Sequence, residues 1–234
     1  MITTVFFDVG ATLLTPRFDE GITFANLANR LDIAIDPQEV IAKVPLMYEL
    51  YDQLYEQDDS FWSDNVRAKA IWIEMYEYLA ALLDIPSDFW HDLAETTYKH
   101  YFSASAWKLY DDVRPTLEKL GRSGFRMGLI SNWDANLDAV IEGLGIAHFF
   151  ETIIASADVC LHKPMPEIFE LALAQMGISA EQAAHVGDHI YADVEGAARV
   201  GMTAMLLDRD NSQSDYPGTR ITSLLDIEPI LMAL

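Results

Sequence analysis

Polar side chains suited to metal or phosphate chemistry follow several apolar stretches of this 234-residue chain. They are Asp8, Ser131 with Asn132, Lys163, and Asp188 with Asp193. Two carboxylates that are held close together repel each other strongly unless a cation lies between them. An oxygen-rich pocket with two acids and room for water suits Mg²⁺. A small anionic substrate is compatible with such a pocket, because a bound metal ion inverts the local field.

These residues have to be positioned by an alternation of strands and helices. The apolar runs predict strands over residues 2–9, 125–131, 151–156, 183–187 and 202–208, with helices near 113–122, 134–144, 165–176, 190–200 and 222–233. This alternation predicts a parallel sheet covered on both faces, with the reactive crevice beyond the carboxyl ends of the strands. If the strands ending at Asp8 and Asp188 are neighbours, their backbones lie ~4.8 Å apart.

The segment between the first two strands has a different pattern, with helical periodicity and many aromatic residues. Helices are expected over residues 40–56 and 65–83, with breaks near Pro37, Pro45, Asp58-Asp59 and Pro86. We therefore expect an α/β core of residues 1–14 and 106–234 and an inserted all-α domain of residues 15–105.

Composition excludes several classes of protein. With 15 basic and 37 acidic residues, the formal charge is −22, which disfavours a nucleic-acid partner. The hydrophobic fraction of 51% argues against disorder, and no apolar run reaches the roughly 18–20 residues that cross a bilayer. No secretory signal is expected, and the single cysteine, Cys160, fits a reducing compartment, so we expect a cytoplasmic protein without a membrane partner.

Four motifs, in order along the chain, resemble those of the haloacid dehalogenase (HAD) superfamily of hydrolases. They read FFDVGATLL, LISNWD, HKPMPEIF and HVGDHIYAD. The helical insert directly after the first motif is similar to the C1-type α-helical cap of that superfamily. The resemblance implies a three-layer Rossmannoid core with a five-stranded parallel sheet in the strand order 5-4-1-2-3.

The resemblance also implies a role for each candidate residue. Asp8 would be the nucleophile that forms an aspartyl-phosphate, and Lys163 would neutralise charge between Asp8 and the phosphoryl group. Ser131 and Asn132 would hold the phosphoryl oxygens, with Thr12 supporting the turn after Asp8. Mg²⁺ would be held by Asp8, the carbonyl of Gly10, Asp188 and, through water, Asp193. The implied substrate is a small phosphorylated metabolite; the sequence leaves its identity and the oligomeric state open.

One departure from the family pattern affects the predicted activity. Phosphatases of this superfamily usually carry a second Asp, a general acid and base, at the position of Gly10. Three explanations remain: a phosphatase that does without this acid or recruits another from the cap, a metal-independent 2-haloacid dehalogenase, or a weakly active binding or regulatory protein. Dehalogenases lack the acid at the position of Asp188, so its presence favours the Mg²⁺-dependent phosphatase.

Other residues near the motifs have simpler interpretations. His162 and His189 are expected to point away from the site, and Cys160 to be a small buried hydrophobe. Trp133 is a candidate to line the crevice. The acids Asp58-Asp59 and Asp111-Asp112 are expected to be solvated loop residues.

Overall fold

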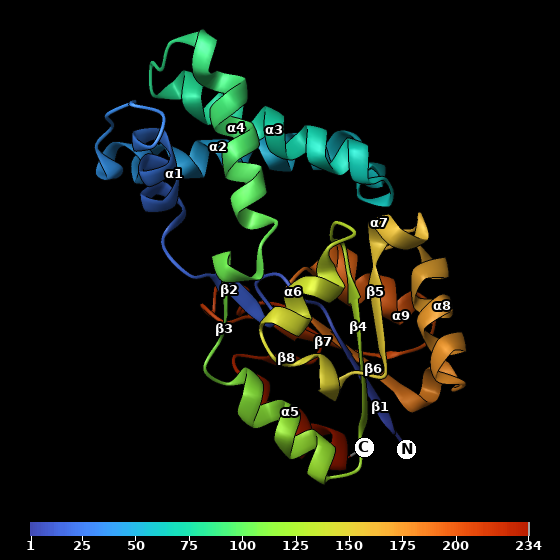
Figure 1. Ribbon diagram of the computed structural model, residues 1–234. Coiled ribbons are helices and arrows are strands. Elements are labelled where there is room, and N and C mark those ends of the chain that lie inside the picture. The colour runs from blue at the N-terminus through green and yellow to red at the C-terminus, as the bar shows by residue number, and fades with distance from the viewer. Residues whose placement is uncertain (234) are drawn as a thin grey trace. The chain divides into compact units, whose positions relative to one another are not determined.

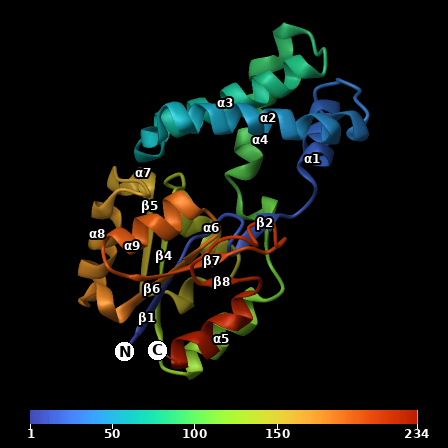
Figure 2. The ribbon, with the colours of Figure 1, turned by 180° about the vertical axis from the view of Figure 1, so that it is seen from behind.

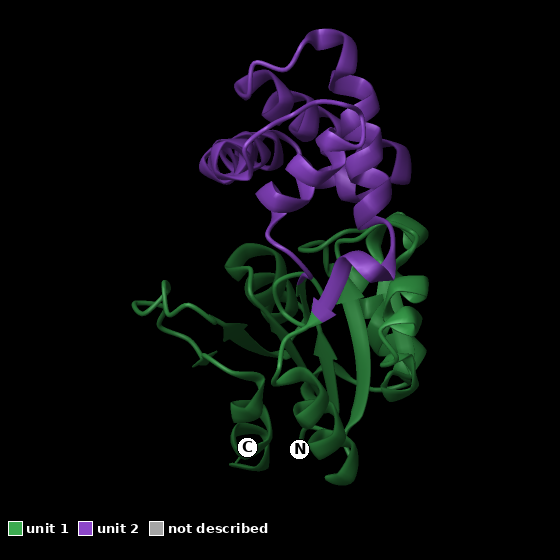
Figure 3. Cartoon of the chain, turned by 60° about the vertical axis from the view of Figure 1, so that its left-hand side comes forward, with its two compact units in different colours: residues 1–15, 109–234 green, residues 16–108 purple. Residues whose placement is uncertain are grey.

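The computed structural model describes residues 1–233, and the chain forms two compact units (Figure 3). Unit 1 comprises residues 1–15 and 109–234, and unit 2 comprises residues 16–108. The sequence predicted the helical insert over residues 15–105. Every helix within the described part of the chain is too short or too polar to cross a lipid bilayer.

Unit 1 contains a six-stranded parallel sheet with the order β5-β4-β1-β6-β7-β8. The strands are β1 Thr4–Phe7, β4 Arg126–Ser131, β5 Thr152–Ala155, β6 Ala183–Gly187, β7 Thr203–Leu207 and β8 Arg220–Ile221. The five predicted strands are present in the predicted order, but the predicted number of strands is wrong. The sixth strand, β8, pairs with β7 at the edge of the sheet through only two residues, too short a run to carry an alternating pattern.

Helices cover both faces of this sheet (Figures 1 and 2). They are α5 Val113–Arg122, α6 Leu137–Gly143, α7 Ser156–Val159, α8 Pro166–Met176, α9 Gly196–Arg199 and α10 Ile227–Ala233, with a π-helical turn at Ile190–Glu195 before α9. Phe6 of β1 packs with residues of α8 and α9 on one face. Helices α5 and α10 pack together on the other side (Figure 1). The result is a three-layer α/β core.

Strand register brings the chemically interesting residues to one edge of the sheet. Phe7 at the end of β1 pairs with Leu129 of β4 and with Val186 of β6. The next residue, Asp8, donates its backbone N–H to the carbonyl of Val186 over 2.9 Å. The strands ending at Asp8 and near Asp188 are therefore neighbours, as predicted.

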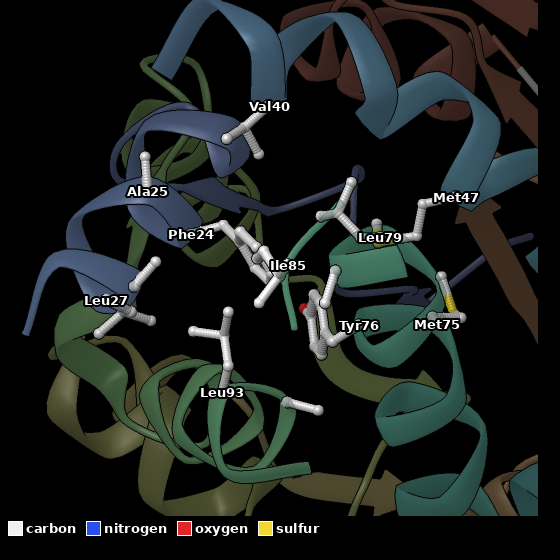
Figure 4. Packing of buried hydrophobic residues seen from close by; sticks show 13 residues of the cluster. Phe24, Ala25, Leu27, Val40, Met47, Met75, Tyr76, Leu79, Ile85 and Leu93 are labelled. Atoms are coloured by element: carbon white, nitrogen blue, oxygen red, sulfur yellow. The ribbon is translucent and has the colours of Figure 1, made fainter. Parts of the chain in front are cut away.

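Unit 2 is a bundle of four helices: α1 Glu20–Asn29, α2 Pro37–Gln57, α3 Asn65–Leu82 and α4 Trp90–Tyr101. Its core is built from buried side chains such as Phe24, Met47, Tyr76 and Leu93 (Figure 4). Aspartates accept backbone hydrogen bonds at the starts of α1, α2 and α3, which satisfies amides that lack a partner within the helix.

The predicted break at Pro45 is wrong, because α2 continues through it. Proline removes one backbone N–H from a helix of 21 residues, and the other hydrogen bonds and the buried residues Val40 and Met47 hold the helix together. Two short strands, β2 Leu14–Pro16 and β3 Trp107–Leu109, pair where the chain leaves unit 1 and returns to it.

Candidate active site

Asp8 lies at the carboxyl end of β1 with only 7% of its surface exposed. Its Oδ1 atom accepts hydrogen bonds from Ser131 Oγ at 2.9 Å and from Lys163 Nζ at 2.5 Å. Burial raises the pKa of Asp8, the Lys163 ammonium opposes that rise, and the charge of Asp193 adds to it. A backbone hydrogen bond from Val9 to the Asp8 carboxylate also lowers its pKa.

Lys163 is held at both its side chain and its backbone. The side chain is 2% exposed and its ammonium donates to Asp8 and to Asp193. Its backbone N–H donates to Asn132 Oδ1 at 2.7 Å, and Asn132 Nδ2 donates to its carbonyl at 3.0 Å. Burial favours the neutral amine, but the two carboxylates outweigh it and raise the pKa of Lys163 to about 12. The lysine is therefore a fixed positive charge beside Asp8.

Asp193 anchors this lysine and is itself held by three donors. Besides Lys163, Oδ1 accepts from His185 Nε2 at 3.0 Å, and Oδ2 accepts from the backbone N–H of His189 at 3.1 Å. Burial disfavours its charge, but the Lys163 charge and the His185 hydrogen bond outweigh this and lower the pKa of Asp193. A Cβ atom on Gly187 would overlap the Asp193 carboxylate, so the close approach requires glycine at that position.

His185 is a member of this network that the sequence analysis missed. It lies within β6, is fully buried, and contacts the ring of Phe169 edge to face. Because Asp193 is ionised, Nε2 of His185 must donate the hydrogen bond. The signal was present in the sequence, since His185 is the one polar side chain in the otherwise apolar run 183–187.

A third carboxylate completes the cluster. Thr12 Oγ1 donates to Asp188 Oδ1 at 2.9 Å. Burial and the charges of Asp8 and Asp193 raise the pKa of Asp188 to about 7. Asp8, Asp188 and Asp193 each offer a carboxylate oxygen within 4.8 Å of the others. Three hard oxygen donors in this arrangement fit a magnesium ion.

The turn after Asp8 brings Gly10 against an aromatic ring. The Gly10 carbonyl accepts the backbone N–H of Thr12 at 2.6 Å, and Ala11 between them has a positive φ of 54°. A Cβ atom on Gly10 would lie 3.4 Å from Cζ3 of Trp133, whose Nε1 donates to Asn136 Oδ1 at 3.2 Å. The Trp133 indole therefore lies beside Gly10, the position at which the second Asp of the family pattern is missing.

Two predictions about neighbouring residues are wrong. Asp112 is not a solvated loop acid: its side chain is 12% exposed and pairs with Arg209. Cys160 is exposed rather than buried, and occupies a left-handed position with φ of 55° at the end of α7. His162 is 6% exposed, and His189 accepts the backbone N–H of Ala192.

Comparison with known proteins agrees with this architecture. The family model described as haloacid dehalogenase-like hydrolase matches residues 2–201. A zebrafish (Danio rerio) protein named haloacid dehalogenase-like hydrolase domain-containing protein 3 is 28% identical, over 96% of this chain and 94% of its own. A glyceraldehyde 3-phosphate phosphatase of Methanothermobacter thermautotrophicus is 30% identical, over 92% of this chain and 89% of its own.

Among solved structures, a 2-haloacid dehalogenase from Pseudomonas syringae pv. Tomato aligns with a TM-score of 0.65 and 26% identity, over 100% of this chain and 99% of that one. The relatives therefore include proteins named for phosphate and for halide chemistry. These proteins and this chain have in common that they are hydrolases of one family. The chain belongs to the haloacid dehalogenase-like hydrolases.

Proposed function

We propose that this hydrolase is a Mg²⁺-dependent phosphatase of small phosphate monoesters that works through an aspartyl-phosphate on Asp8. The observation that supports this most directly is the charge of the cluster. Three carboxylates, Asp8, Asp188 and Asp193, share one ammonium, that of Lys163. When all three carboxylates are ionised, the cluster carries an excess of two negative charges, which matches one divalent cation.

Asp8, Asp188 and the Gly10 carbonyl would hold the metal, with Asp193 contributing through water. Bound there, the ion would neutralise charge on the phosphoryl oxygens. Asp193 already accepts three hydrogen bonds, so its main contribution is to fix Lys163. Asp193 fixes Lys163 as an ion pair, in which the carboxylate stays ionised and the ammonium keeps its proton.

In the first chemical step, a carboxylate oxygen of Asp8 bonds to phosphorus while the bond from phosphorus to the leaving oxygen breaks. The Lys163 ammonium and the Ser131 hydroxyl, both already within hydrogen-bond distance of Asp8, stabilise the charge on the transferred group. Water then attacks the phosphoryl group, releasing inorganic phosphate and restoring the carboxylate. Asn132 acts on the backbone of Lys163, so we assign it to positioning the lysine rather than to holding substrate.

Gly10 and Trp133 bear on the substrate class. The Trp133 indole, whose N–H already donates to Asn136, lies beside Gly10, the position at which phosphatases of this superfamily usually carry the acid that protonates the leaving oxygen. We therefore propose that the preferred phosphate monoesters have acidic leaving groups, such as aryl phosphates, which depart without a proton. The competing explanation is that an acidic side chain of unit 2, acting as a cap, protonates the leaving oxygen in place of the missing Asp.

A metal-independent dehalogenase is the second candidate, favoured by the similarity to the Pseudomonas syringae enzyme. Two assays on the purified chain distinguish the two activities. The phosphatase is supported if p-nitrophenyl phosphate hydrolysis requires Mg²⁺, disappears in Asp8→Asn, and leaves a phosphorylated Asp8 peptide after acid quench. Chloride release from 2-chloropropionate in EDTA supports the dehalogenase instead. Silence in both assays with Mg²⁺ still bound supports a binding or regulatory protein.

A further inference from the structure

Arg209, two residues beyond the end of β7, uses all three of its guanidinium nitrogens. Nε donates to the carbonyl of Ala11 at 3.3 Å, and Nη2 donates to the carbonyl of Thr12 at 2.7 Å. Nη1 and Nη2 each donate to Asp112 at 3.1 Å, and the guanidinium lies 3.9 Å from the centre of the Tyr110 ring. This fork engages two chain segments, residues 11–12 and 110–112, that are about a hundred residues apart in sequence. Arg209 itself follows Asp112 by 97 residues.

These two segments are the ones through which the chain leaves unit 1 and comes back. Ala11 and Thr12 lie just before the exit at residue 15, and Tyr110 and Asp112 lie just after the return at residue 109. One guanidinium therefore fastens both segments to the core on the unit 1 side.

Asp112, the carboxylate that Arg209 binds, is itself held by the C-terminal part of unit 1. Asp112 Oδ2 accepts Ser223 Oγ at 2.9 Å and the backbone N–H of Leu224 at 3.0 Å. The Asp112 carboxylate and the Arg209 side chain are 12% and 20% exposed, so solvent weakens their attraction less than at an open surface. The contact set fixes Arg209 in one orientation.

The same guanidinium supports the turn that leads to the carboxylate cluster. Ala11 occupies a left-handed conformation, which is unfavourable for a residue with a Cβ atom, so hydrogen bonds from outside the turn help to hold it. The two carbonyls that Arg209 binds belong to Ala11 and to Thr12, and the hydroxyl of Thr12 donates to Asp188.

We propose that Arg209 is a positioning residue: it holds the Ala11–Thr12 turn, and through Thr12 it keeps Asp188 placed to bind a metal. Part of this inference rests on the proposed function, because it takes the carboxylate cluster as the metal site.

The test compares Arg209→Met with Arg220→Met in the full chain. Arg220 is a matched control, because it is similarly exposed at 24% and pairs with Asp208 near the same end of the sheet without touching the turn. Isothermal titration with Mg²⁺ alone should show a dissociation constant raised about 10- to 100-fold in Arg209→Met, the range for residues that orient metal ligands. Arg220→Met should bind Mg²⁺ as the unsubstituted protein does, and Arg209→Lys should fall between, since an ammonium lacks the planar fork.

Hydrogen exchange gives a second readout that needs neither metal nor substrate. The amides of Thr12, Leu13 and Leu14 bond to carbonyls within the turn. They should exchange faster in Arg209→Met than in Arg220→Met at matched melting temperature.

Equal exchange in the two variants would overturn the proposal that Arg209 holds the turn. An unchanged Mg²⁺ dissociation constant in Arg209→Met would overturn the proposal that it keeps Asp188 placed. If the unsubstituted chain binds Mg²⁺ but hydrolyses no phosphate ester, the proposed function fails while both readouts still decide the role of Arg209. If it binds no Mg²⁺, the metal part of this inference is overturned.

Discussion

The indole of Trp133 lies against Gly10, with 3.4 Å between Cζ3 and the position that a Cβ atom on Gly10 would take. This is ordinary van der Waals separation, so a larger side chain at residue 10 fits if it turns away from the ring. The position has no positive φ, so the backbone also tolerates a substitution. The missing acid can therefore be restored by a single change.

Gly10→Asp should accelerate alkyl phosphates more than aryl phosphates, because only alkoxide leaving groups need a proton. General acid catalysis typically contributes ~10²–10⁴-fold, which sets the upper limit of the gain. The measurement is kcat/KM for a series of phosphate esters plotted against leaving-group pKa. Gly10→Asn is the control, since it has the same shape and no acidic proton. A slope unchanged by Gly10→Asp would show that the leaving group already receives a proton elsewhere.

Asp188→Asn should stabilise the metal-free protein at high pH and abolish its stabilisation by Mg²⁺. The pKa of Asp188 is raised to about 7 from an ordinary value of 3.8, so the folded state retains a proton that the unfolded state has lost. The free energy of unfolding of the metal-free protein therefore falls as pH rises through this window. The titration is shared with Asp8, since the two carboxylates repel each other.

The measurement for Asp188→Asn is the melting temperature at pH 5 and pH 8, with and without Mg²⁺. Without metal, the variant should gain more on the unsubstituted protein at pH 8 than at pH 5. Asp226→Asn, at an exposed acid in the C-terminal segment, controls for the change in net charge. If both variants shift alike, general charge repulsion rather than the carboxylate cluster is responsible.

His185→Leu should lower kcat/KM roughly 10- to 100-fold, because a hydrogen bond to a charged group contributes about 1.5–3 kcal/mol and its loss loosens the Asp193 anchor of Lys163. His185→Gln keeps an N–H donor and should retain most of the activity. Steady-state kinetics and melting temperature are measured for both. Equal loss of activity and stability in the two variants would mean that His185 only packs against Phe169.

Gly187→Ala should lower both stability and activity, because its Cβ atom would overlap the Asp193 carboxylate and displace it from Lys163. Gly121→Ala in α5 is the matched control: its Cβ atom meets only Met127 at 3.8 Å, and an alanine there should stabilise the helix by about 0.5–1 kcal/mol. Denaturant unfolding and phosphatase assays of both variants check this. Full activity in Gly187→Ala would contradict the proposed part of Asp193.

The strands and the residues at their ends were predictable from the sequence because each depends on a few neighbouring positions. An apolar run followed by an acid predicts a strand ending at Asp8, and parallel strands bring such ends to one edge. The adjacency of β1 and β6 then places Asp8 near Asp188. Lys163 pairs with Asp8 at this edge and also with Asp193.

The contacts that were missed join residues far apart in sequence and leave little local trace. Asp112 looks like a loop acid until Arg209, 97 positions later, is placed beside it. Trp133 against Gly10 depends on how two loops meet. His185 was overlooked because a residue inside a buried strand is usually interpreted as part of the core. Only its hydrogen bond to Asp193 indicates that it belongs to the candidate site.

The short edge strands of the sheet affect how readily copies of the chain associate. Its outer strands, β5 and β8, contain four and two residues, so each edge offers few unpaired backbone groups to a neighbouring molecule. With a formal charge of −22, approaching copies also repel one another. Edge-to-edge strand addition, a common route to aggregation of β-sheets, is therefore disfavoured for this chain.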